Sequence, residues 1–252
     1  MENKTQNFLM RGKLGDFIQS LFALKNLCKQ NNYKADLFMY DLPSGIGWER
    51  GIENTYAELY NIIISQEYVN SFSILEGKVD NVIDLGNFIK SPLLYRACWA
   101  EIFSNQFNFK IEKEYKWINY DNINPVLTDK ILIHRRSKYP INIHFPYEQL
   151  IKDNPGKIVF ISTDEEDFIK FPWHKQIEFL KIETMNDWFT SINSCEIIIS
   201  NISSPACIAN ALDAPRIIEL PETIDAKHWM GEKNYSSNLF WLYDSYLNYL
   251  PK

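Results

Sequence analysis

The chain has 252 residues, of which 46% are hydrophobic and 15% aromatic, so it can bury a sizeable core and does not have the composition of a disordered protein. Its formal net charge of −6 at pH 7 argues against a nucleic acid as the main partner, although a local basic cluster can still hold a phosphate. No apolar run approaches the roughly 18–20 residues of a membrane span, and the first residues lack the apolar region of a signal peptide. We therefore expect a cytoplasmic protein with no integral membrane segment.

Strands and helices alternate in the first half of the chain. Hydrophobic periodicity predicts a strand at Asn7–Arg11, a helix at Asp16–Lys29, a strand at Ala35–Tyr40, a helix at Tyr56–Ile64, a strand at Val79–Leu85 and a helix at Leu93–Phe103. The segment Asp41–Gly51 is rich in turn-forming residues and is expected to be a loop. This alternation is typical of parallel strands joined by crossover helices.

A domain boundary is expected near residues 119–129, where periodicity is lost and polar turn residues collect. We therefore predict an N-terminal domain over 1–122 and a C-terminal domain over 123–252. The second domain is predicted to contain strands at Lys130–His134, Lys157–Ser162, Phe179–Ile182, Glu196–Ser200 and Arg216–Leu220, with helices at Tyr147–Lys152, Asp164–Lys170, Asn186–Asn193 and Ser204–Leu212. The aromatic-rich tail, 235–249, is expected to be a C-terminal helix that packs on the core. A membrane-surface role for it is disfavoured because the stretch lacks a basic face.

These patterns predict an α/β protein made of two open domains that face each other across a cleft. In open parallel sheets, ligands bind beside the carboxyl ends of the strands. The residues that follow each predicted strand are therefore the candidates for a functional site. The four cysteines are far apart and form no C-x-x-C pair, so we expect reduced core residues and no metal site.

The first candidate segment is "RGKLGD", which follows the first strand and opens the first helix. Gly12 and Gly15 let the backbone turn tightly and approach a ligand, and Lys13 lies between them. Asp16 stands at the start of the helix, where a carboxylate is stabilised by the helix dipole. Two interpretations are open: Asp16 caps the helix, or it is a catalytic base.

The loop "PSGIGWERG", residues 43–51, belongs to the same predicted domain. It is either a plain surface loop or a loop that holds an acceptor molecule, with Trp48 stacking on a sugar.

The second candidate segment is "HRRSKY", which leaves the first strand of the second domain. A buried, unpaired guanidinium is costly, so packing explains consecutive arginines at a strand end poorly. Arg135 and Arg136 offer the paired donors and permanent charge that suit a phosphate; the alternative is that they are exposed loop residues. His134 is expected to be a hydrogen-bonding residue at the strand end rather than a base.

Two further segments follow later strands. In "STDEEDF", Thr163 and Asp164 either form a helix start or contact a hydroxyl or base edge of a nucleotide. In "ISNISSPACIANAL", a strand is followed by Asn201, Ser203 and Ser204 and then by a helix with proline in its first turn. This segment is a good helix start in any protein, and it also offers side-chain and backbone donors to an anion.

Two stretches resemble the ADP-heptose:lipopolysaccharide heptosyltransferases, glycosyltransferase family nine. "GKLGDFIQSLFALKNL" is similar to the opening of that family, where a Gly-Asp pair and a small-apolar helix end the first strand. "CEIIISNISSPACIANALDAPRIIEL" looks like the donor-side segment of the family and of its bacterial and phage relatives. The family's usual D-T-G before the donor helix is replaced here by "NISSP". Its lysine-bearing segment is replaced by "HRRSKYPIN".

The resemblance implies a GT-B fold, in which two Rossmann-like domains face each other. The N-terminal domain would take the acceptor and the C-terminal domain the nucleotide-activated sugar. The family's catalytic aspartate corresponds to Asp16, and its phosphate-gripping turn corresponds to Asn201, Ser203 and Ser204. "HRR" at a strand end is also similar to a segment of fucosyltransferases that hold GDP with an arginine. The identity of the nucleotide base in the donor is therefore left open.

The expected activity is transfer of a sugar from a nucleoside-diphosphate sugar to a glycan or glycolipid acceptor, with inversion and without a metal or other cofactor. Asp16 would take the proton of the attacking hydroxyl, and Arg135, Arg136 and the amides near Ser203 would stabilise the leaving diphosphate. Two alternatives stay open. One is a sugar-nucleotide epimerase or hydrolase with the same fold, and the other is a catalytically degenerate module that binds a nucleotide or sugar.

Overall fold

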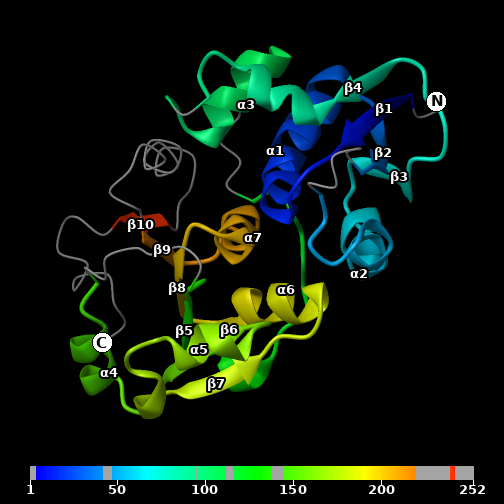
Figure 1. The fold of residues 1–252 in the computed structure, drawn as a ribbon. Coiled ribbons are helices and arrows are strands. Elements are labelled where there is room, and N and C mark those ends of the chain that lie inside the picture. Colours follow the sequence, from blue (N-terminus) through cyan, green and yellow to red (C-terminus); the bar gives the residue numbers. More distant parts are fainter. Residues whose placement is uncertain are drawn as a thin grey trace.

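A computed structural model describes residues 4–41, 47–94, 96–111, 116–137, 145–219 and the backbone of 239–241. Within these ranges the chain forms two lobes, each built on its own parallel sheet (Figure 1). The N-terminal lobe holds a four-stranded sheet and the C-terminal lobe a six-stranded sheet. The predicted α/β class, with two parallel sheets and crossover helices, is confirmed.

The sheet of the N-terminal lobe has the strand order β3-β2-β1-β4. The elements of this lobe are β1 (Thr5–Met10), α1 (Leu14–Asn31), β2 (Lys34–Met39), α2 (Ile52–Ile64), β3 (Val69–Ile74), β4 (Val82–Asp84) and α3 (Trp99–Phe107). The sequence pattern did not predict β3, because only two of its residues, Val69 and Phe72, are buried. Such a pattern is too weak for a two-residue period to stand out.

The sheet of the C-terminal lobe has the strand order β10-β9-β8-β5-β6-β7. Its elements are β5 (Ile131–His134), α4 (Tyr147–Asp153), β6 (Ile158–Ser162), α5 (Glu165–Ile169), β7 (Glu178–Lys181), α6 (Met185–Ser194), β8 (Ile197–Asn201), α7 (Ser204–Leu212), β9 (Arg216–Glu219) and β10 (Leu239–Trp241). Every residue of β5, β6 and β8 is buried, as expected for central parallel strands that are covered on both faces. The carboxyl ends of these three strands therefore meet at the middle of one sheet edge.

One expectation about the C-terminal tail is wrong where the structure describes it. Residues 239–241 form a strand, β10, that pairs in parallel with β9, whereas the aromatic spacing predicted a helix there. Pairing with an open sheet edge outweighed the local helical period. The remaining residues of the predicted helix, 235–238 and 242–249, lie outside the described ranges.

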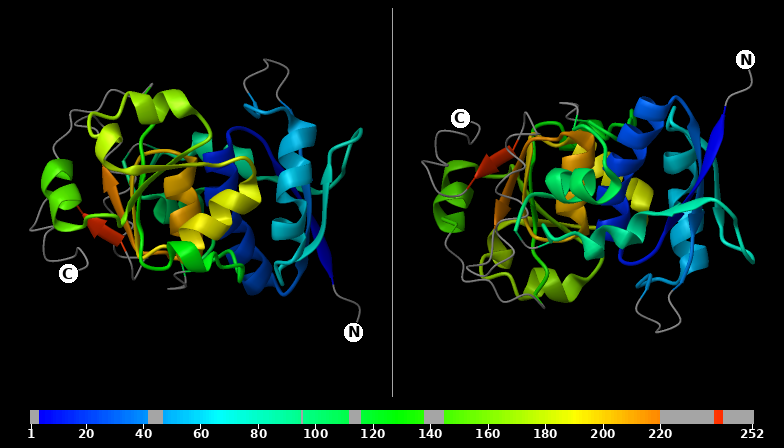
Figure 2. Two further views of the ribbon diagram at one scale, coloured as in Figure 1. Left: turned by 90° about the horizontal axis from the view of Figure 1, so that it is seen from below. Right: turned by 90° about the horizontal axis from the view of Figure 1, so that it is seen from above.

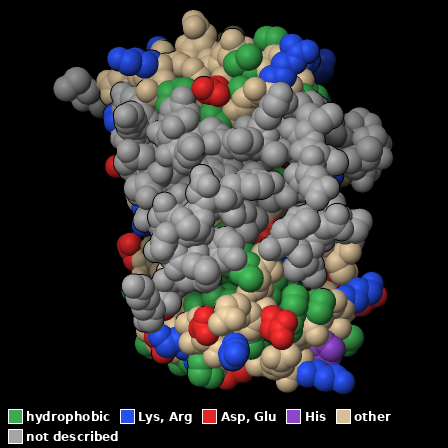
Figure 3. All heavy atoms as spheres, turned by 90° about the vertical axis from the view of Figure 1, so that its left-hand side faces the viewer, with side chains coloured by type: hydrophobic (Ala, Val, Ile, Leu, Met, Phe, Trp, Pro, Cys, Tyr) green, Lys and Arg blue, Asp and Glu red, His purple; other side chains and the backbone are tan. Residues whose placement is uncertain are grey.

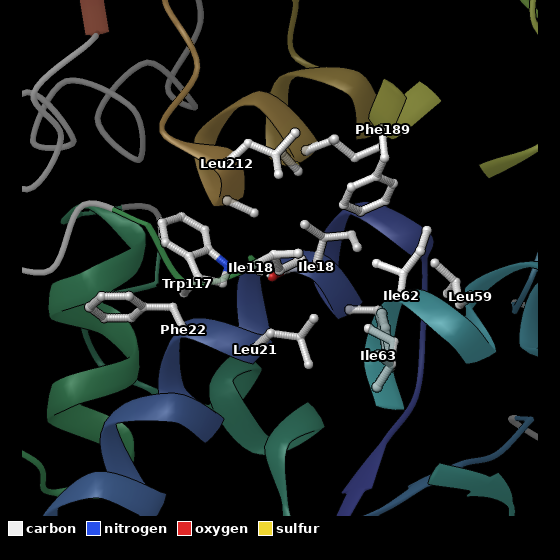
Figure 4. Close-up of a cluster of buried hydrophobic side chains, with 14 of the residues drawn as sticks. Ile18, Leu21, Phe22, Leu59, Ile62, Ile63, Trp117, Ile118, Phe189 and Leu212 are labelled. Atoms are coloured by element: carbon white, nitrogen blue, oxygen red, sulfur yellow. Dashed lines mark hydrogen bonds between the residues drawn. The ribbon is translucent and has the colours of Figure 1, made fainter. Parts of the chain in front are cut away.

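The two lobes pack directly on each other through their helices. Helix α1 lies against α7 and α2 lies against α6, and Figure 2 shows α6 and α7 (yellow and orange) facing α1 and α2 (blue and cyan). One hydrophobic cluster runs through both lobes. Figure 4 shows its centre, where the side chains of Ile18 of α1, Leu59 of α2, Phe189 of α6 and Leu212 of α7 gather. A second cluster belongs to the C-terminal lobe alone.

The segment between the lobes is held to both of them. The backbone N–H groups of Trp117 and Ile118 donate to Ala211 O of α7, and the indole N–H of Trp117 donates to Ile18 O of α1 at 3.0 Å. Three residues further on, the hydroxyl of Tyr120 lies 2.7 Å from Thr190 Oγ1 of α6. Residues 117–120 are thus held to helices of both lobes, and we refer to this segment as the strap.

The described surface carries charges of both signs. On the face shown in Figure 3, basic and acidic side chains are interspersed above and below the atoms drawn in grey. Among the helices that the structure describes, none combines the length and the apolar character needed to cross a membrane.

Candidate functional site

A cavity of about 300 Å³ lies between the two lobes. The N-terminal lobe lines it with the start of α1, residues 47–50, two residues of α2 and Trp99 of α3. The C-terminal lobe lines it with residues at or just after the ends of β5, β6 and β8, and with residues of α6 and α7. The cavity therefore occupies the place that the topology predicts for a ligand in open parallel sheets.

Two glycines shape the wall of the cavity. Gly12 follows β1 with φ = +105°, a conformation that strains any residue with a Cβ. Gly15 permits a close approach between the lobes, because a Cβ there would lie 3.2 Å from Cys207 Sγ and 3.8 Å from Ser204 Oγ. The first turns of α1 and α7 therefore touch, although Gly15 and Ser204 are 189 residues apart in the sequence. Gly15 lines the cavity, whereas Gly12 is outside the lining.

Asp16 lies in the first turn of α1 and lines the cavity. The backbone N–H of Lys13, the N-cap residue, lies near this carboxylate and favours its charged form. Burial raises the pKa of the Asp16 carboxyl, and the nearby charge of Lys13 opposes that shift. Both interpretations of Asp16 therefore stay open, because its carboxylate lies near the N-cap backbone and the residue also lines the cavity.

The N-terminus of α7 also faces the cavity. Ser203 is its N-cap residue, yet the hydroxyl of Ser203 donates to Asn201 O at 3.1 Å and makes no capping bond to its own helix. The first-turn N–H groups of a helix have no partner within the helix, and they carry the positive end of the helix dipole. Ser203 and Ser204 line the cavity, so this helix start can hold an anion there.

Arg136 brings a permanent positive charge to the cavity. Its Nε lies 3.5 Å from Asp167 Oδ2, and one terminal nitrogen lies 3.8 Å from Glu49 Oε2 of the opposite lobe. Asp167 is 4% exposed and accepts from the Ser137 N–H at 2.7 Å and from the Ser162 hydroxyl at 3.2 Å. Asp167 therefore fixes both the arginine and the loop that carries it, a role that the sequence pattern did not indicate.

Asn201 supports the same loop from β8. Its amide oxygen accepts the backbone N–H of Arg136, and its amide nitrogen donates to the backbone oxygen of Arg136, both at 3.3 Å. Asn201 is fully buried and is not part of the cavity lining. Its position makes it a support for Arg136, and its predicted contact with a donor stays a prediction.

Arg135 points away from the cavity. Its Nε donates to Glu219 Oε2 at 2.7 Å, and its guanidinium lies 5.8 Å from the ring of Tyr147. Neighbouring residues of an extended chain project to opposite sides, so only one of the two arginines can line the cavity. Similarly, Thr163 lines it, whereas Asp164 caps α5 by accepting the Glu166 N–H at 2.9 Å.

Three tryptophans contribute to the cavity wall, and the sequence pattern indicated only Trp48. The indole N–H of Trp48 donates to Tyr40 O at 3.4 Å, and its ring packs edge-on against Phe17, with centroids 5.6 Å apart. Trp99 of α3 and Trp188 of α6 complete the aromatic wall. Both lie on helices at positions that looked like ordinary core residues.

A polar link between the two lobes lies at the cavity. The guanidinium of Arg50 contacts Glu58 Oε1 of α2 at 2.9 Å and the backbone oxygen of Glu183 at 2.9 Å. Glu58 in turn accepts the N–H of Met185, the first residue of α6, at 3.1 Å. This link connects the loop before α2 with the start of α6 across the two lobes.

No protein-family model matches the sequence, and no curated protein matches it either. The structure is similar to solved structures of heptosyltransferase WaaC from E. coli, with ADP-2-deoxy-2-fluoro heptose (TM-score 0.60, 11% identity, covering 94% of this chain and 92% of that one) and with ADP (0.63, 12%, 94% and 92%). It is also similar to a glycosyltransferase family 9 structure from Veillonella parvula DSM 2008 (0.54, 13%, 96% and 87%).

These similarities extend over both lobes and nearly the full length of the compared chains. They confirm the predicted fold, which is GT-B-like, with two Rossmann-like domains facing across a cleft. The neighbours include members of the group that the two quoted sequence stretches resemble. At 11–13% identity the likeness is one of fold, and an assignment of chemistry has to rest on the cavity itself.

Proposed function

We propose that this chain is a glycosyltransferase that moves a sugar from a nucleoside-diphosphate sugar to a glycan or glycolipid acceptor. The observation that supports this most strongly is the meeting of Asp16, Arg136 and the N-terminus of α7 in one cavity between the lobes. The carboxylate can accept a proton, and the other two groups supply fixed positive charge for a diphosphate. Asp16 and the α7 donors lie in the first turns of helices, and Asp167 and Asn201 hold the loop that carries Arg136.

In the proposed reaction, a hydroxyl oxygen of the acceptor attacks the anomeric carbon of the donor sugar. The new carbon–oxygen bond forms as the bond from that carbon to the diphosphate breaks, and the hydroxyl proton passes to Asp16. Direct displacement of this kind inverts the anomeric configuration. The raised pKa of Asp16 brings its basicity closer to that useful for proton transfer near neutral pH.

The leaving nucleoside diphosphate gains negative charge in this step. Arg136 and the open N–H groups at the start of α7 are aimed at the cavity before any ligand arrives, and such fixed donors stabilise developing charge without rearranging. Lys13 adds a further positive charge at the opposite lobe. This set of groups supports a metal-independent mechanism.

The experiment that tests this function is product analysis after incubation with UDP-, GDP-, ADP- and CMP-activated sugars, with and without oligosaccharide acceptors. Transfer to the acceptor with inverted configuration, undiminished by EDTA, is the expected result. Release of a free sugar or of an epimer would assign the chain to the alternative class of sugar-nucleotide enzymes. Binding without any turnover would identify a degenerate binding module.

Arg136→Ala is expected to weaken binding of the nucleoside diphosphate by about 10- to 100-fold, since a charged hydrogen bond contributes roughly 1.5–3 kcal/mol. Isothermal titration with the diphosphate measures the effect. Lys170→Ala is the matched control, because Lys170 pairs with Glu166 at 2.6 Å on the surface and its removal lowers the net charge equally. Equal affinities for the two variants would contradict a direct contact between Arg136 and the ligand.

Glu49→Gln is expected to tighten diphosphate binding by a fewfold. Glu49 lies 3.8 Å from Arg136 and its side chain is 68% exposed, so the pair is worth at most about 1 kcal/mol in water. The carboxylate competes with an anionic ligand for the same guanidinium, and the amide does not. The gain should shrink as the salt concentration rises; a gain that is independent of salt would show that another effect of the substitution is responsible.

A further inference from the structure

His134 has a ring nitrogen that no contact in the described structure accounts for. The residue ends β5, lines the cavity and is 2% exposed. Its Nδ1 lies 2.8 Å from Ile161 O, whereas its Nε2 is buried and has no hydrogen-bond partner among the described residues. A buried polar atom without a partner is unusual and costs free energy. Because His134 also lines the cavity, a ligand held there is a candidate for the missing partner.

The contact at Nδ1 fixes the chemistry available at Nε2. A backbone carbonyl can only accept a hydrogen bond, so Nδ1 carries the proton and donates to Ile161 O. Burial lowers the pKa of His134 to about 4, so the ring is neutral at physiological pH and its Nε2 is an acceptor with a free lone pair. Such an atom suits a hydroxyl or N–H donor and repels a phosphate oxygen.

The ring is also held in place. Trp188 packs edge-on against it, with ring centroids 5.1 Å apart and an interplanar angle of 83°, and Trp188 lines the cavity as well. Arg136, two residues along the chain, lines the same cavity. A neutral acceptor thus stands beside the cationic group that we assign to the diphosphate. Such an arrangement suits a ligand whose diphosphate contacts Arg136 and whose uncharged part contacts His134.

We propose that Nε2 of His134 accepts a hydrogen bond from a neutral donor group, a hydroxyl or N–H, of the nucleotide sugar. This inference rests on the proposed function. Nothing is transferred to the ring, so His134 selects and orients the ligand and takes no part in the bond-making step. Its contact partner belongs either to the sugar or to the nucleoside, and the two sources can be separated by experiment.

Two substitutions test the roles of the two ring nitrogens separately. His134→Asn places an amide N–H near the position of Nδ1 and keeps the bond to Ile161 O, but it has no group at the position of Nε2. His134→Gln reaches the position of Nε2 with an amide oxygen and gives up the bond to Ile161 O. A ligand contact predicts that the Asn variant binds poorly and the Gln variant binds better. A purely structural histidine predicts that the Asn variant matches the wild type.

The measurement is isothermal titration with UDP, GDP and ADP and with UDP-glucose, GDP-mannose and ADP-glucose, accompanied by thermal melts. We expect His134→Asn to weaken binding of the preferred nucleotide sugar roughly tenfold, and His134→Gln to recover at least part of that loss. A loss confined to the sugar conjugate places the partner group on the sugar, and a loss shared by the free diphosphate places it on the nucleoside.

His174→Asn is the matched control. His174 also has its Nδ1 bonded to a backbone carbonyl, Phe171 O at 2.9 Å, but it does not line the cavity, so its substitution should leave affinity unchanged. In the wild type, the ¹⁵N resonance of His134 Nε2 should shift when the ligand binds, which gives a readout without any substitution.

The inference is overturned if the wild type binds a nucleotide sugar and His134→Asn binds it equally well, or if the Nε2 resonance does not respond to bound ligand. It is also overturned if the Gln variant loses as much affinity as the Asn variant and melts at a lower temperature, because the bond to Ile161 would then be the one that matters. Failure of the wild type to bind any of the six probes would refute the proposed function, and the role of His134 with it.

Discussion

Asp16→Asn is expected to lower the rate of sugar transfer by about 10²–10⁴-fold, the usual contribution of a positioned general base. The asparagine keeps the size of the side chain and an oxygen near the N–H of Lys13, but an amide cannot take up the proton of the attacking hydroxyl. Steady-state kinetics should show the loss in kcat, with KM for the nucleotide sugar little changed. The wild-type rate should rise with pH through a pKa above the ordinary range of an aspartate.

The same substitution should leave the protein as stable as the wild type at neutral pH, or more stable. Because burial raises the pKa of Asp16, the folded state binds the proton more tightly than the unfolded chain does. The stability contributed by the protonated group is complete below the unfolded pKa, and it is lost as the pH rises through the folded pKa. Thermal melts at pH 4 and pH 7 should therefore show the variant gaining relative to the wild type at the higher pH.

Glu53→Gln provides the matched control for Asp16. Glu53 is the acidic residue in the first turn of α2, is exposed and does not line the cavity. Its substitution should cost a few tenths of a kcal/mol from the helix dipole and leave transfer unaffected. If Asp16→Asn behaved in the same way, with a small loss of stability and a normal rate, Asp16 would be a helix-capping residue only.

Trp117→Ala is expected to destabilise the whole chain by about 3–5 kcal/mol, as is usual for removing a buried tryptophan. Trp117 is 5% exposed and packs edge-on against Phe22 with centroids 5.5 Å apart. Its indole N–H donates to Ile18 O of α1, and the substitution removes that bond. Removing it opens a cavity where the two lobes share one core. Urea unfolding followed by far-ultraviolet circular dichroism should show one transition moved to lower urea concentration.

Ile133→Ala tests whether the lobes unfold together. Ile133 is fully buried in the cluster that belongs to the C-terminal lobe alone, and its truncation should cost about 2–5 kcal/mol. If the shared core couples the lobes, both variants shift the same single transition. Two separate transitions, of which Ile133→Ala moves only one, would show that the lobes fold independently and that the strap at Trp117 contributes little to their coupling.

The sequence predicted most elements of the fold because their signals are local. Three fully buried strands and a helix that starts after Ser203 with a proline in its first turn follow from patterns within a few residues. The elements that the sequence pattern did not predict correctly lack such a local signal. Helical spacing in the tail gave no information about the open edge of β9, with which residues 239–241 pair, and β3 has too few buried residues for its period to be visible.

The sequence likewise predicted some residues of the candidate site and could not identify others. The rule that ligands gather at strand ends led from the sequence to Asp16, Arg136, Ser203 and Ser204, and all four line one cavity. The same rule could not separate Arg136 from Arg135, which turns away to bond with Glu219. It also gave no reason to single out Trp188, because a tryptophan on an apolar helix face looks like any core residue until its neighbours are known.

The sequence by itself determined that the chain alternates strands and helices in two parallel α/β units and which segments follow the strands, because apolar runs, helical spacing and turn residues are patterns among near neighbours. Only the tertiary structure decided which polar atoms face the cavity and which are satisfied elsewhere. Both carboxylate oxygens of Asp167 contact the loop of Arg136, whereas His134 keeps one nitrogen without a partner among the described residues. That difference depends on contacts between residues far apart in the chain, and such contacts leave no local pattern to read.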